Sequence, residues 1–437
     1  MRTHKYLAGV STLAVSLFLA NAAVAADPPQ APVPPVFIPE PAHSWTGPYV
    51  GVFIGAGGIV NDIEIPGLGA GNFNGIGGEG VFGGVMLGYN FQVSSNFVIG
   101  IEGEIAATDL TTELNIPGII SIDAQPEWTA AVSARLGWLT SPNTMLYLIG
   151  GYSYADYNVD LALLGGSASF SQDYHGFHVG TGMETHISNS LTVRVEYRYT
   201  QYGGEDWGTA GFLDIEPSSH TGRIALAYNF YNVGLNGVSS TTPGYAPDSW
   251  SGFYVGLYGG AGAIVNNIEI PGLGAGNLNG IGGEGLLGGA MIGYDYQFGS
   301  NWVAGIQGEI GITDMTTELN IPGIISIDAQ PEWTAAVSGR LGWLPVPETM
   351  LYVIGGYSYA DYNVDLALFG GSASFSQDYH GFHVGTGMET YLNKNLTARV
   401  EYRYTQYGGE DWGTGGILDI EPSSHVGRVG LAWKFGR

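Results

Sequence analysis

The stretch LTVRVEYRYT at positions 191–200 alternates between two kinds of side chain. Its first, third, fifth, seventh and ninth positions hold Leu, Val, Val, Tyr and Tyr, whereas Thr, Arg, Glu, Arg and Thr lie between them. A two-residue period predicts a β-strand with one apolar face and one polar face. The polar face would meet water in a soluble sandwich, but it would face the lumen in a membrane barrel.

Seven other segments in the first half of the chain have the size or the pattern of such a strand. The alternation is clear at 97–104, 128–138 and 223–230, and it is less regular at about 48–59, 81–93, 144–156 and 172–186. A tilted membrane strand needs roughly 9–11 residues, which most of these segments supply. On the apolar face, Trp128 and Trp138 are expected to mark two aromatic girdles at the membrane interfaces.

The connections between these segments alternate in length. Short turns are expected at 94–96, 140–143 and 187–190, and long connections near 60–80, 110–126, 157–171 and 203–218. Short periplasmic turns and long outer loops are typical of bacterial transmembrane barrels. The pattern therefore predicts an antiparallel up-and-down β-barrel with both ends of the unit on the periplasmic side.

The composition agrees with a membrane barrel and argues against several other classes. Of 437 residues, 45% are hydrophobic and only 12% charged, whereas about a quarter of the residues of a soluble protein are charged. Outside the N-terminus, no stretch offers the roughly 18 uninterrupted apolar residues of a membrane helix. The lack of cysteine excludes disulfides and thiolate chemistry. A net charge of −26 argues against nucleic acid as a partner.

The N-terminus has the features of a secretory signal peptide over residues 1–25. Arg2 and Lys5 precede an apolar run, and AVA at 23–25 forms an A-x-A cleavage site. Residues 26–44 form a Pro-rich leader that is expected to be extended rather than part of a core.

The remainder of the chain is a tandem repeat of one unit. WTGPYVG begins at Trp45 and WSGFYVG at Trp250, and this offset of 205 residues holds without a gap to the end. Residues 45–230 therefore form a first β-barrel unit and residues 250–437 a second, joined by a polar periplasmic linker at 231–249. Two arrangements fit the duplication: two eight-stranded barrels, which the Pro-bearing spacer favours, or one fused sixteen-stranded barrel of porin size.

Basic residues lie almost entirely on the polar faces of the predicted strands, beside glutamates. We expect an Arg–Glu network that plugs each lumen, because removing the partner of a buried charge costs roughly 3–5 kcal/mol. An eight-stranded barrel has just enough interior for side chains to fill it. The predicted network consists of Glu102, Glu104, Arg135, Arg194, Glu196, Arg198 and Arg223 in the first unit and of Glu309, Arg340, Arg399, Glu401, Arg403 and Arg428 in the second.

Two further expectations concern the lumens. Gln307 replaces the equivalent of Glu102, so the second network is expected to have one negative charge fewer and to survive through hydrogen bonding. Glycines opposite bulky side chains would make room for the network. The candidates are Gly51, Gly55, Gly100 and Gly137.

Several motifs resemble a known family. The opening W-[TS]-G-x-Y-V-G, the middle ARLGW and MLYLIGGYSYADY, the strand RVEYRYTQYG and the closing R-x-[AG]-L-A-[YW]-x-F are similar to alphaproteobacterial opacity-type, immunogenic outer-membrane surface antigens. The resemblance covers nearly all of both units. It implies an eight-stranded, non-enzymatic outer-membrane barrel with structural and surface-interaction roles, and haemin binding or modest pore activity is associated with some members.

The chain departs from that family in two ways. The tandem duplication is unusual. Family members typically end at an aromatic residue that the insertion machinery reads, whereas Phe435 is followed by Gly436 and Arg437, and its copy Phe230 is internal. The resemblance therefore leaves the insertion of the first unit in question.

Other chemical signals are weak. His175 and His178 could ligate a metal, but a three-residue step along a strand points them to opposite faces, so girdle or lumen positions are favoured. Ser171, Asp173 and His175 supply the residue types of a hydrolase without a nucleophile-elbow motif. The glycine-rich stretch GLGAGNFNGIGGEG at 67–80 lacks the P-loop lysine and is interpreted as a flexible surface loop.

Acidic residues populate the long loops, which hold no basic residue. They make divalent cations and divalent-bridged lipopolysaccharide candidate partners, although solubility and repulsion at the cell surface explain them equally well. In the first unit they are Asp62, Glu64, Glu79, Glu113, Asp123, Glu205, Asp206, Asp214 and Glu216.

The sequence thus predicts an all-β outer-membrane protein of two tandem eight-stranded barrels that contributes to envelope integrity and surface interaction. No catalytic site, cofactor or bound metal is expected. The expected partners are outer-membrane lipid, lipopolysaccharide, divalent cations at the acidic loops and the barrel-insertion machinery, with no nucleic acid. The alternative function is a diffusion porin formed by a single sixteen-stranded barrel.

Overall fold

The computed structural model describes residues 44–64, 72–116, 120–163, 166–207, 213–230, 244–270, 276–321, 325–368, 371–412 and 418–435. The predicted signal peptide, nearly all of the leader and the linker up to residue 243 lie outside the described residues. Residues Ala42–Arg437 form one compact unit. Within the described ranges, no helix is long and apolar enough to cross a membrane.

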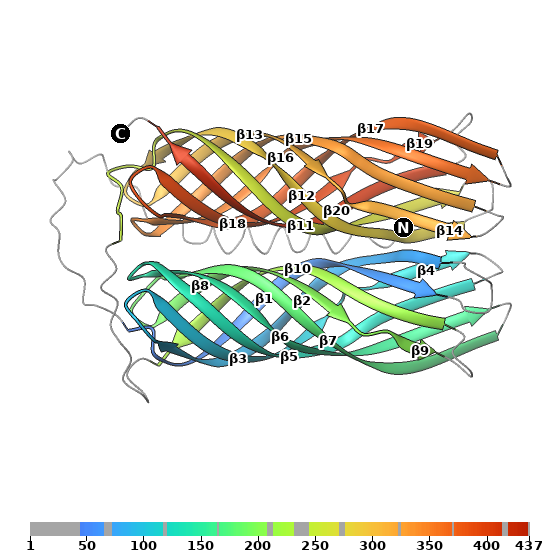
Figure 1. Ribbon diagram of the computed structural model, residues 1–437, viewed down its shortest axis with the longest axis horizontal. Helices are drawn as coiled ribbons and strands as arrows, with labels where there is room; N and C mark the ends of the chain where they lie inside the picture. Colours follow the sequence, from blue (N-terminus) through green and yellow to red (C-terminus); the bar gives the residue numbers. More distant parts are fainter. Residues whose placement is uncertain are drawn as a thin grey trace. The chain divides into compact units, whose positions relative to one another are not determined.

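The first unit is a closed ring of antiparallel strands (Figure 1). The ring closes because β1 pairs with β2 on one side and with β10 on the other. Two short strands, β4 and β9, continue β3 and β8, since they pair with the same neighbours. The strands are β1 (Gly47–Glu64), β2 (Asn72–Gln92), β3 (Phe97–Thr108), β4 (Thr112–Ile116), β5 (Ile120–Ser141), β6 (Thr144–Leu163), β7 (Gly166–His186), β8 (Leu191–Tyr202), β9 (Glu205–Trp207) and β10 (Leu213–Asn229).

The second unit repeats this topology and closes separately, through the pairing of β11 with β20. Its strands are β11 (Gly252–Ile270), β12 (Gly276–Phe298), β13 (Trp302–Thr313), β14 (Thr316–Ile321), β15 (Ile325–Val346), β16 (Thr349–Leu368), β17 (Gly371–Tyr391), β18 (Leu396–Tyr407), β19 (Glu410–Trp412) and β20 (Leu418–Lys434). The fold is therefore all-β, with two antiparallel up-and-down barrels in tandem (Figure 1).

Several strands are longer than the sequence pattern predicts. β6 runs to Leu163 and β7 begins at Gly166, so the long loop expected at 157–171 is almost entirely strand. The interpretation of 67–80 as a loop is also wrong from Asn72 onward, where β2 begins.

The physical reason for this extension is that packing inside the barrel continues past the charged layer. Tyr157, Tyr174 and Tyr202 form mutual edge-to-face contacts inside the outer part of the first barrel, with ring centroids 5.0–6.5 Å apart. The copies Tyr362, Tyr379 and Tyr407 repeat these contacts. Such aromatic pairs stabilise the strands that carry them beyond what burial alone provides.

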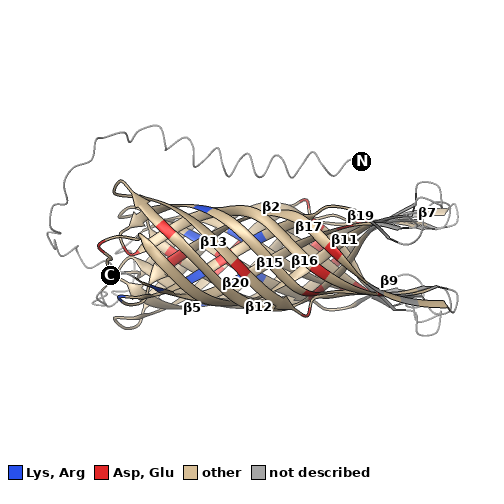
Figure 2. Cartoon of the chain, turned by 90° about the horizontal axis from the view of Figure 1, so that it is seen from above, with Lys and Arg blue, Asp and Glu red and all other residues tan. Residues whose placement is uncertain are grey.

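Outward and inward side chains differ in kind over the middle of each barrel. Ile101, Val132 and Leu148 point outward and are 66%, 65% and 62% exposed, whereas Glu102 and Arg135 point inward and are buried. Figure 2 shows that the basic residues lie along the barrel strands. Exposed apolar side chains around a closed barrel form a lipid-facing surface.

Aromatic side chains border this surface. Trp138 is exposed near the short turns. Trp128 lies toward the other end, where its ring contacts Tyr154 at 4.9 Å and its indole donates to Asp156. His175 packs on the same tyrosine at 5.5 Å. A ring with one apolar body and one polar handle is suited to a membrane interface.

Candidate functional site

The inner charged layer of the first barrel is centred on two arginines. Arg194 of β8 contacts Glu102 of β3 at 2.5 Å and Glu184 of β7 at 2.8 Å. Arg135 of β5 contacts the same two carboxylates, Glu184 at 2.7 Å and Glu102 at 3.9 Å. Because β3 and β7 are not neighbours in the ring, these guanidinium groups bridge the lumen.

A second layer lies on the outer side of the first. Arg198 contacts Glu104 at 2.6 Å and Glu196 at 3.0 Å. Arg223 contacts the same two glutamates at 2.8 and 2.6 Å. Each carboxylate is thus shared by two guanidinium groups, so these buried charges are paired, as buried charges must be to avoid a large desolvation cost.

Tyrosines complete the hydrogen bonding of the carboxylates. The Tyr49 hydroxyl donates to Glu102 at 2.7 Å, and the Tyr147 hydroxyl donates to Glu196 at 2.7 Å. The Arg135 guanidinium also lies 4.1 Å from the centre of the Tyr147 ring, within range of a cation–π contact.

Glycines make the room for this packing. A Cβ at Gly51, Gly55, Gly100 or Gly137 would lie 2.1–2.5 Å from the side chain of a neighbouring strand. These side chains belong to Met86, Phe82, Asn90 and Met145.

The inner layer of the second barrel differs from that of the first. Arg340 and Arg399 both contact Glu389, at 2.8 and 3.0 Å. Gln307 accepts a hydrogen bond from Arg399 at 2.8 Å, in the place where Glu102 forms an ion pair. Asp295 adds a carboxylate 2.5 Å from Arg340.

The outer layer of the second barrel matches that of the first. Arg428 contacts Glu309 at 2.9 Å, and Arg403 contacts Glu401 at 3.0 Å. The crossed pairs Arg403–Glu309 and Arg428–Glu401 are also formed. The structure therefore brings together all the lumen residues selected from the sequence, seven in one barrel and six in the other.

Four buried members of these clusters were missed by the sequence reasoning. They are Glu184, Glu389, Asp295 and Lys434. Lys434 contacts Asp295 at 2.6 Å. The expectation that the second lumen has one negative charge fewer is therefore wrong, since Asp295 occupies the position of Asn90 and restores the carboxylate.

Comparison of the two copies contains the signal that could have found Asp295 and Lys434. Asn90 and Asn229 of the first unit become Asp295 and Lys434 in the second, so an ion pair replaces two amides. The side-chain amide of Asn90 is buried without a hydrogen-bond partner among the described residues. The paired change removes that unsatisfied group.

The histidines occupy opposite faces, as the three-residue spacing indicates. His178 points inward, where its two ring nitrogens contact the hydroxyls of Ser133 at 2.9 Å and Ser153 at 2.8 Å. His175 points outward and contacts Tyr152. Among the described residues, no group of three or more His, Asp and Glu side chains is placed to hold a metal ion.

The hydrolase residue types are not assembled as a triad. His175 Nδ1 contacts the Tyr152 hydroxyl, and Asp173 accepts a hydrogen bond from the Tyr154 hydroxyl at 2.6 Å. Asp173 also lies opposite Asp156 in the strand register rather than beside a nucleophile.

Two of the acidic residues face each other beyond the Trp128 girdle. Asp123 lies opposite Asp160 in the register of β5 and β6, and Asp328 lies opposite Asp365 in the second unit. Partial burial and the Asp160 carboxylate raise the pKa of Asp123. Like charges directly opposite in a sheet destabilise the pairing.

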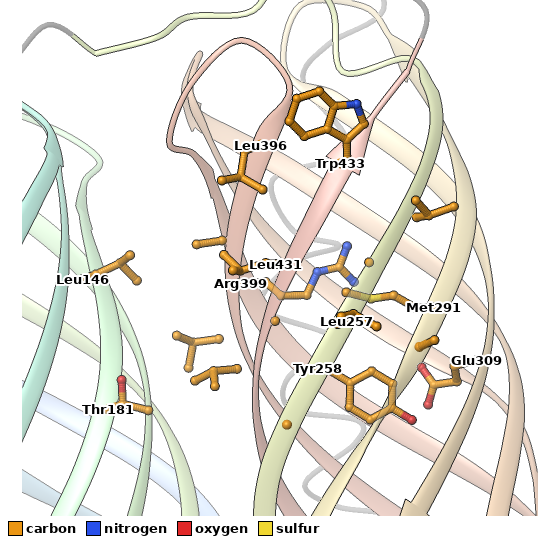
Figure 3. A pocket seen from close by; sticks show the side chains of 18 of the residues that line it. Leu146, Thr181, Leu257, Tyr258, Met291, Glu309, Leu396, Arg399, Leu431 and Trp433 are labelled. Atoms are coloured by element: carbon orange, nitrogen blue, oxygen red, sulfur yellow. The ribbon is translucent and has the colours of Figure 1, made fainter.

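A groove of about 1190 Å³ opens between the outer faces of the two barrels. Figure 3 shows Leu146 on one side and Leu257, Leu431 and Trp433 on the other. Glu309 also lines it, and this carboxylate is paired with arginines of the second lumen. The groove wall is otherwise largely apolar, which suits the acyl chains of a membrane better than a polar ligand.

Known proteins are similar to the chain in sequence. A family model described as the outer membrane protein beta-barrel domain matches residues 11–230 and again 237–435. The 31 kDa outer-membrane immunogenic protein of Brucella melitensis is 31% identical over 236 residues, which cover 49% of this chain and 97% of that protein. The 25 kDa outer-membrane immunogenic protein of the same organism is 28% identical over 231 residues, which cover 53% and 100%. Each relative thus has about the length of one unit.

Solved structures include similar barrels. The toluene transporter TodX of Pseudomonas putida matches with a TM-score of 0.28 and 12% identity, covering 89% of this chain and 90% of that chain. A similarity of this size carries no inference about transport.

Proposed function

Because the chain belongs to the outer membrane protein beta-barrel domain family, we propose that it is a sealed structural and surface-exposed barrel protein rather than a channel or an enzyme. Its relatives are named outer-membrane proteins, and the bacterial outer membrane is where it resides. The proposal concerns what the lumens and the outer strand ends do there.

The observation that carries the proposal is the ionic bridge across each lumen. Arg194 joins strands on different sides of the first ring, and Arg340 joins Asp295 of β12 to Glu389 of β17 in the second. A void next to Arg399 and Glu401 in the second lumen has a volume of only about 10 Å³. A space of that size holds about one water molecule.

Side chains at both ends of the first lumen support the same conclusion. Trp45 is buried in a cluster with Leu139 and Met145, and its indole donates to the carbonyl of Pro142 in a short turn. At the other end, Tyr157, Tyr174 and Tyr202 are buried and pack edge to face on one another. Three layers of packed side chains therefore lie in series along the barrel.

The surface role rests on the strand ends that extend past the aromatic girdle. They carry carboxylates such as Asp123 and Asp160 and present them away from the lipid-facing belt. The relatives are named immunogenic, which fits parts exposed at the cell surface. We propose contact with lipopolysaccharide and its divalent cations as the interaction of these ends, and envelope integrity as its result.

Planar-bilayer recording with the full-length protein tests the sealed lumen. We expect no steady open-channel current from bilayers in which insertion has been verified by heat-modifiable gel migration, while a known porin conducts in the same bilayer. Large, steady unit currents would overturn the proposal, because they would show that the separately closed barrels conduct.

A further inference from the structure

The first sign of an additional interaction surface is a strand that is buried on both faces. In β3, outward side chains are exposed, whereas nearly every residue of β8 is buried. Val195 and its copy Val400 point away from the lumens, yet they are 0% and 2% exposed. Lipid-facing positions of a lone barrel are not covered by protein, so another part of the same compact unit must cover these strands.

At the outer end of the covered faces, a glutamate of each barrel accepts a hydrogen bond from a histidine of the other barrel. Glu79 of β2 accepts a hydrogen bond from His425 Nε2 of β20 at 3.0 Å, and Glu284 of β12 accepts one from His220 Nε2 of β10 at 3.1 Å. In each case, the hydroxyl of the serine two residues before the histidine donates to the same carboxylate oxygen, at 2.7–2.8 Å. Each barrel thus supplies the acid for the histidine of the other.

Each histidine is also held from its own barrel. A carboxylate only accepts, so the Nε2–H of each histidine is the donor to it. The Tyr197 hydroxyl lies 2.5 Å from His220 Nδ1, and the Tyr402 hydroxyl lies 2.6 Å from His425 Nδ1. Both ring nitrogens of each histidine therefore have a hydrogen-bond partner.

The tyrosine rings fit sockets that only glycine can form. A Cβ at Gly427 would lie 2.0 Å from the Tyr197 ring, and a Cβ at Gly222 would lie 2.0 Å from the Tyr402 ring. Both glycines point outward, because each precedes an arginine of the lumen. Larger side chains there would suit the lipid but would prevent the two barrels from meeting.

The contacts obey a pseudo-twofold symmetry whose axis runs along the barrels. Thr144 contacts its own copy Thr349 at 2.7 Å near the short turns. Gly77 lies against its copy Gly282 at the other end, where a Cβ at Gly77 would be 3.0 Å from the Cα of Gly282. A residue that touches its own copy lies on the symmetry axis of an isologous contact.

From these contacts we propose that the two units dock as an isologous pair within one chain. The occupant of each covered face is the other unit, and the exchanged carboxylates Glu79 and Glu284 fasten the outer end. The duplication thus makes permanent a contact that separate single barrels would form only at high concentration, because tethering raises the effective concentration of the partner.

Disulfide trapping tests the pairing, since the chain contains no cysteine. In the full-length protein in membranes, Thr144→Cys with Thr349→Cys should give an intrachain crosslink, recognised by its gel shift and by mass spectrometry of the joined peptides. The control pair Val132→Cys with Val337→Cys occupies equivalent lipid-facing positions, 65% and 66% exposed. We expect a yield at least roughly tenfold above that control.

A second experiment tests the face itself. Gly222→Leu with Gly427→Leu should reduce the Thr144–Thr349 crosslink several-fold while both barrels remain folded by gel migration. Gly103→Leu with Gly308→Leu is the matched control, because a Cβ at these outward glycines meets nothing nearer than 4.0 Å. The control should leave the crosslink unchanged.

Three results would overturn the proposal. One is the absence of the crosslink although each single cysteine reacts with a maleimide. Another is a crosslink between chains in place of the intrachain product. The third is a crosslink that persists undiminished in the Gly222→Leu, Gly427→Leu variant.

Discussion

Arg194 illustrates how many contacts one side chain can make in a narrow lumen. It is 2% exposed, contacts the carboxylates of Glu102 and Glu184, and lies 4.6 Å from the centre of the Tyr49 ring. Its copy Arg399 contacts one carboxylate and the neutral amide of Gln307. The two arginines occupy equivalent places, but Arg194 pairs with two carboxylates and Arg399 with one.

This difference predicts unequal costs for the same substitution. Arg194→Ala should destabilise the first barrel by roughly 3–5 kcal/mol, because the buried Glu102 carboxylate loses its partner at 2.5 Å and keeps only Arg223 at 3.6 Å and Arg135 at 3.9 Å. Arg399→Ala should cost less, since the partner it leaves in the place of Glu102 is the uncharged side chain of Gln307. Thermal unfolding in detergent, followed by circular dichroism and gel migration, measures both. An unchanged melting profile for Arg194→Ala would show that the charged network is not structural.

At the scale of the strand, inward glycines let neighbouring strands interlock. A Cβ at Gly182 of β7 would lie 2.4 Å from the Tyr147 hydroxyl and 2.8 Å from the carbonyl oxygen of Val195. That tyrosine is itself held by its hydrogen bond to Glu196, so it has little freedom to move.

Gly182→Val should therefore destabilise the first barrel by roughly 1–3 kcal/mol through overpacking. Gly103→Val is the matched control, because this glycine points outward and the nearest atom to its Cβ lies at 4.0 Å. Urea-induced unfolding in lipid or detergent measures the difference. Equal stabilities of the two variants would refute the interlocking of β6 and β7.

The outer end of the β5–β6 hairpin should respond to pH. Partial burial and Asp160 raise the pKa of Asp123 in the folded hairpin above its value in the unfolded chain. The carboxylate repulsion therefore opposes folding at pH values above the raised pKa, and it is relieved as the pH falls through it.

Replacing the facing residue tests this origin. Asp160→Asn should lower the pKa of Asp123 toward its ordinary value, as followed by NMR titration of the side-chain carboxyl. Asp328, whose partner Asp365 stays in place, is the internal control and should titrate as before. A titration of Asp123 that does not move in the variant would assign its shift to burial alone.

Strands with strict alternation were predictable from the sequence, and the others were not. Residues 191–200 and the segment starting at Phe97 lie in strands that begin where the pattern begins. In β7, glycines alternate with mixed side chains, so the inward direction of Glu184 has no polarity pattern to reveal it. The outer strand ends were missed because backbone pairing and Tyr–Tyr contacts, rather than alternation, hold them.

At the scale of the whole molecule, the offset of 205 residues identifies two units but not how they meet. Tyr197 and Val195 satisfy the outward apolar pattern whether lipid or protein covers them. The burial of both faces of β8 in the structure separates these alternatives. The two-residue alternation within a strand contains no information about contacts between the two units.

The orientation of the whole protein can be tested on intact cells. An epitope tag inserted between β9 and β10 or between β19 and β20 should be accessible to antibody from outside, because the described ends of these strands lie away from the short turns. A tag inserted after Asn189, in a short turn between β7 and β8, should be accessible only after the outer membrane is permeabilised. The reverse pattern of labelling would invert the assigned topology.

The sockets at Gly222 and Gly427 have a consequence for how this gene can change. Replacing either glycine by a larger residue causes a clash with an aromatic ring that is encoded in the other half of the gene. The two halves therefore cannot diverge independently along the shared surface. We expect natural variants to accumulate differences at the lipid belt and the outer tips first, and to keep these two sockets and their tyrosines as a matched set.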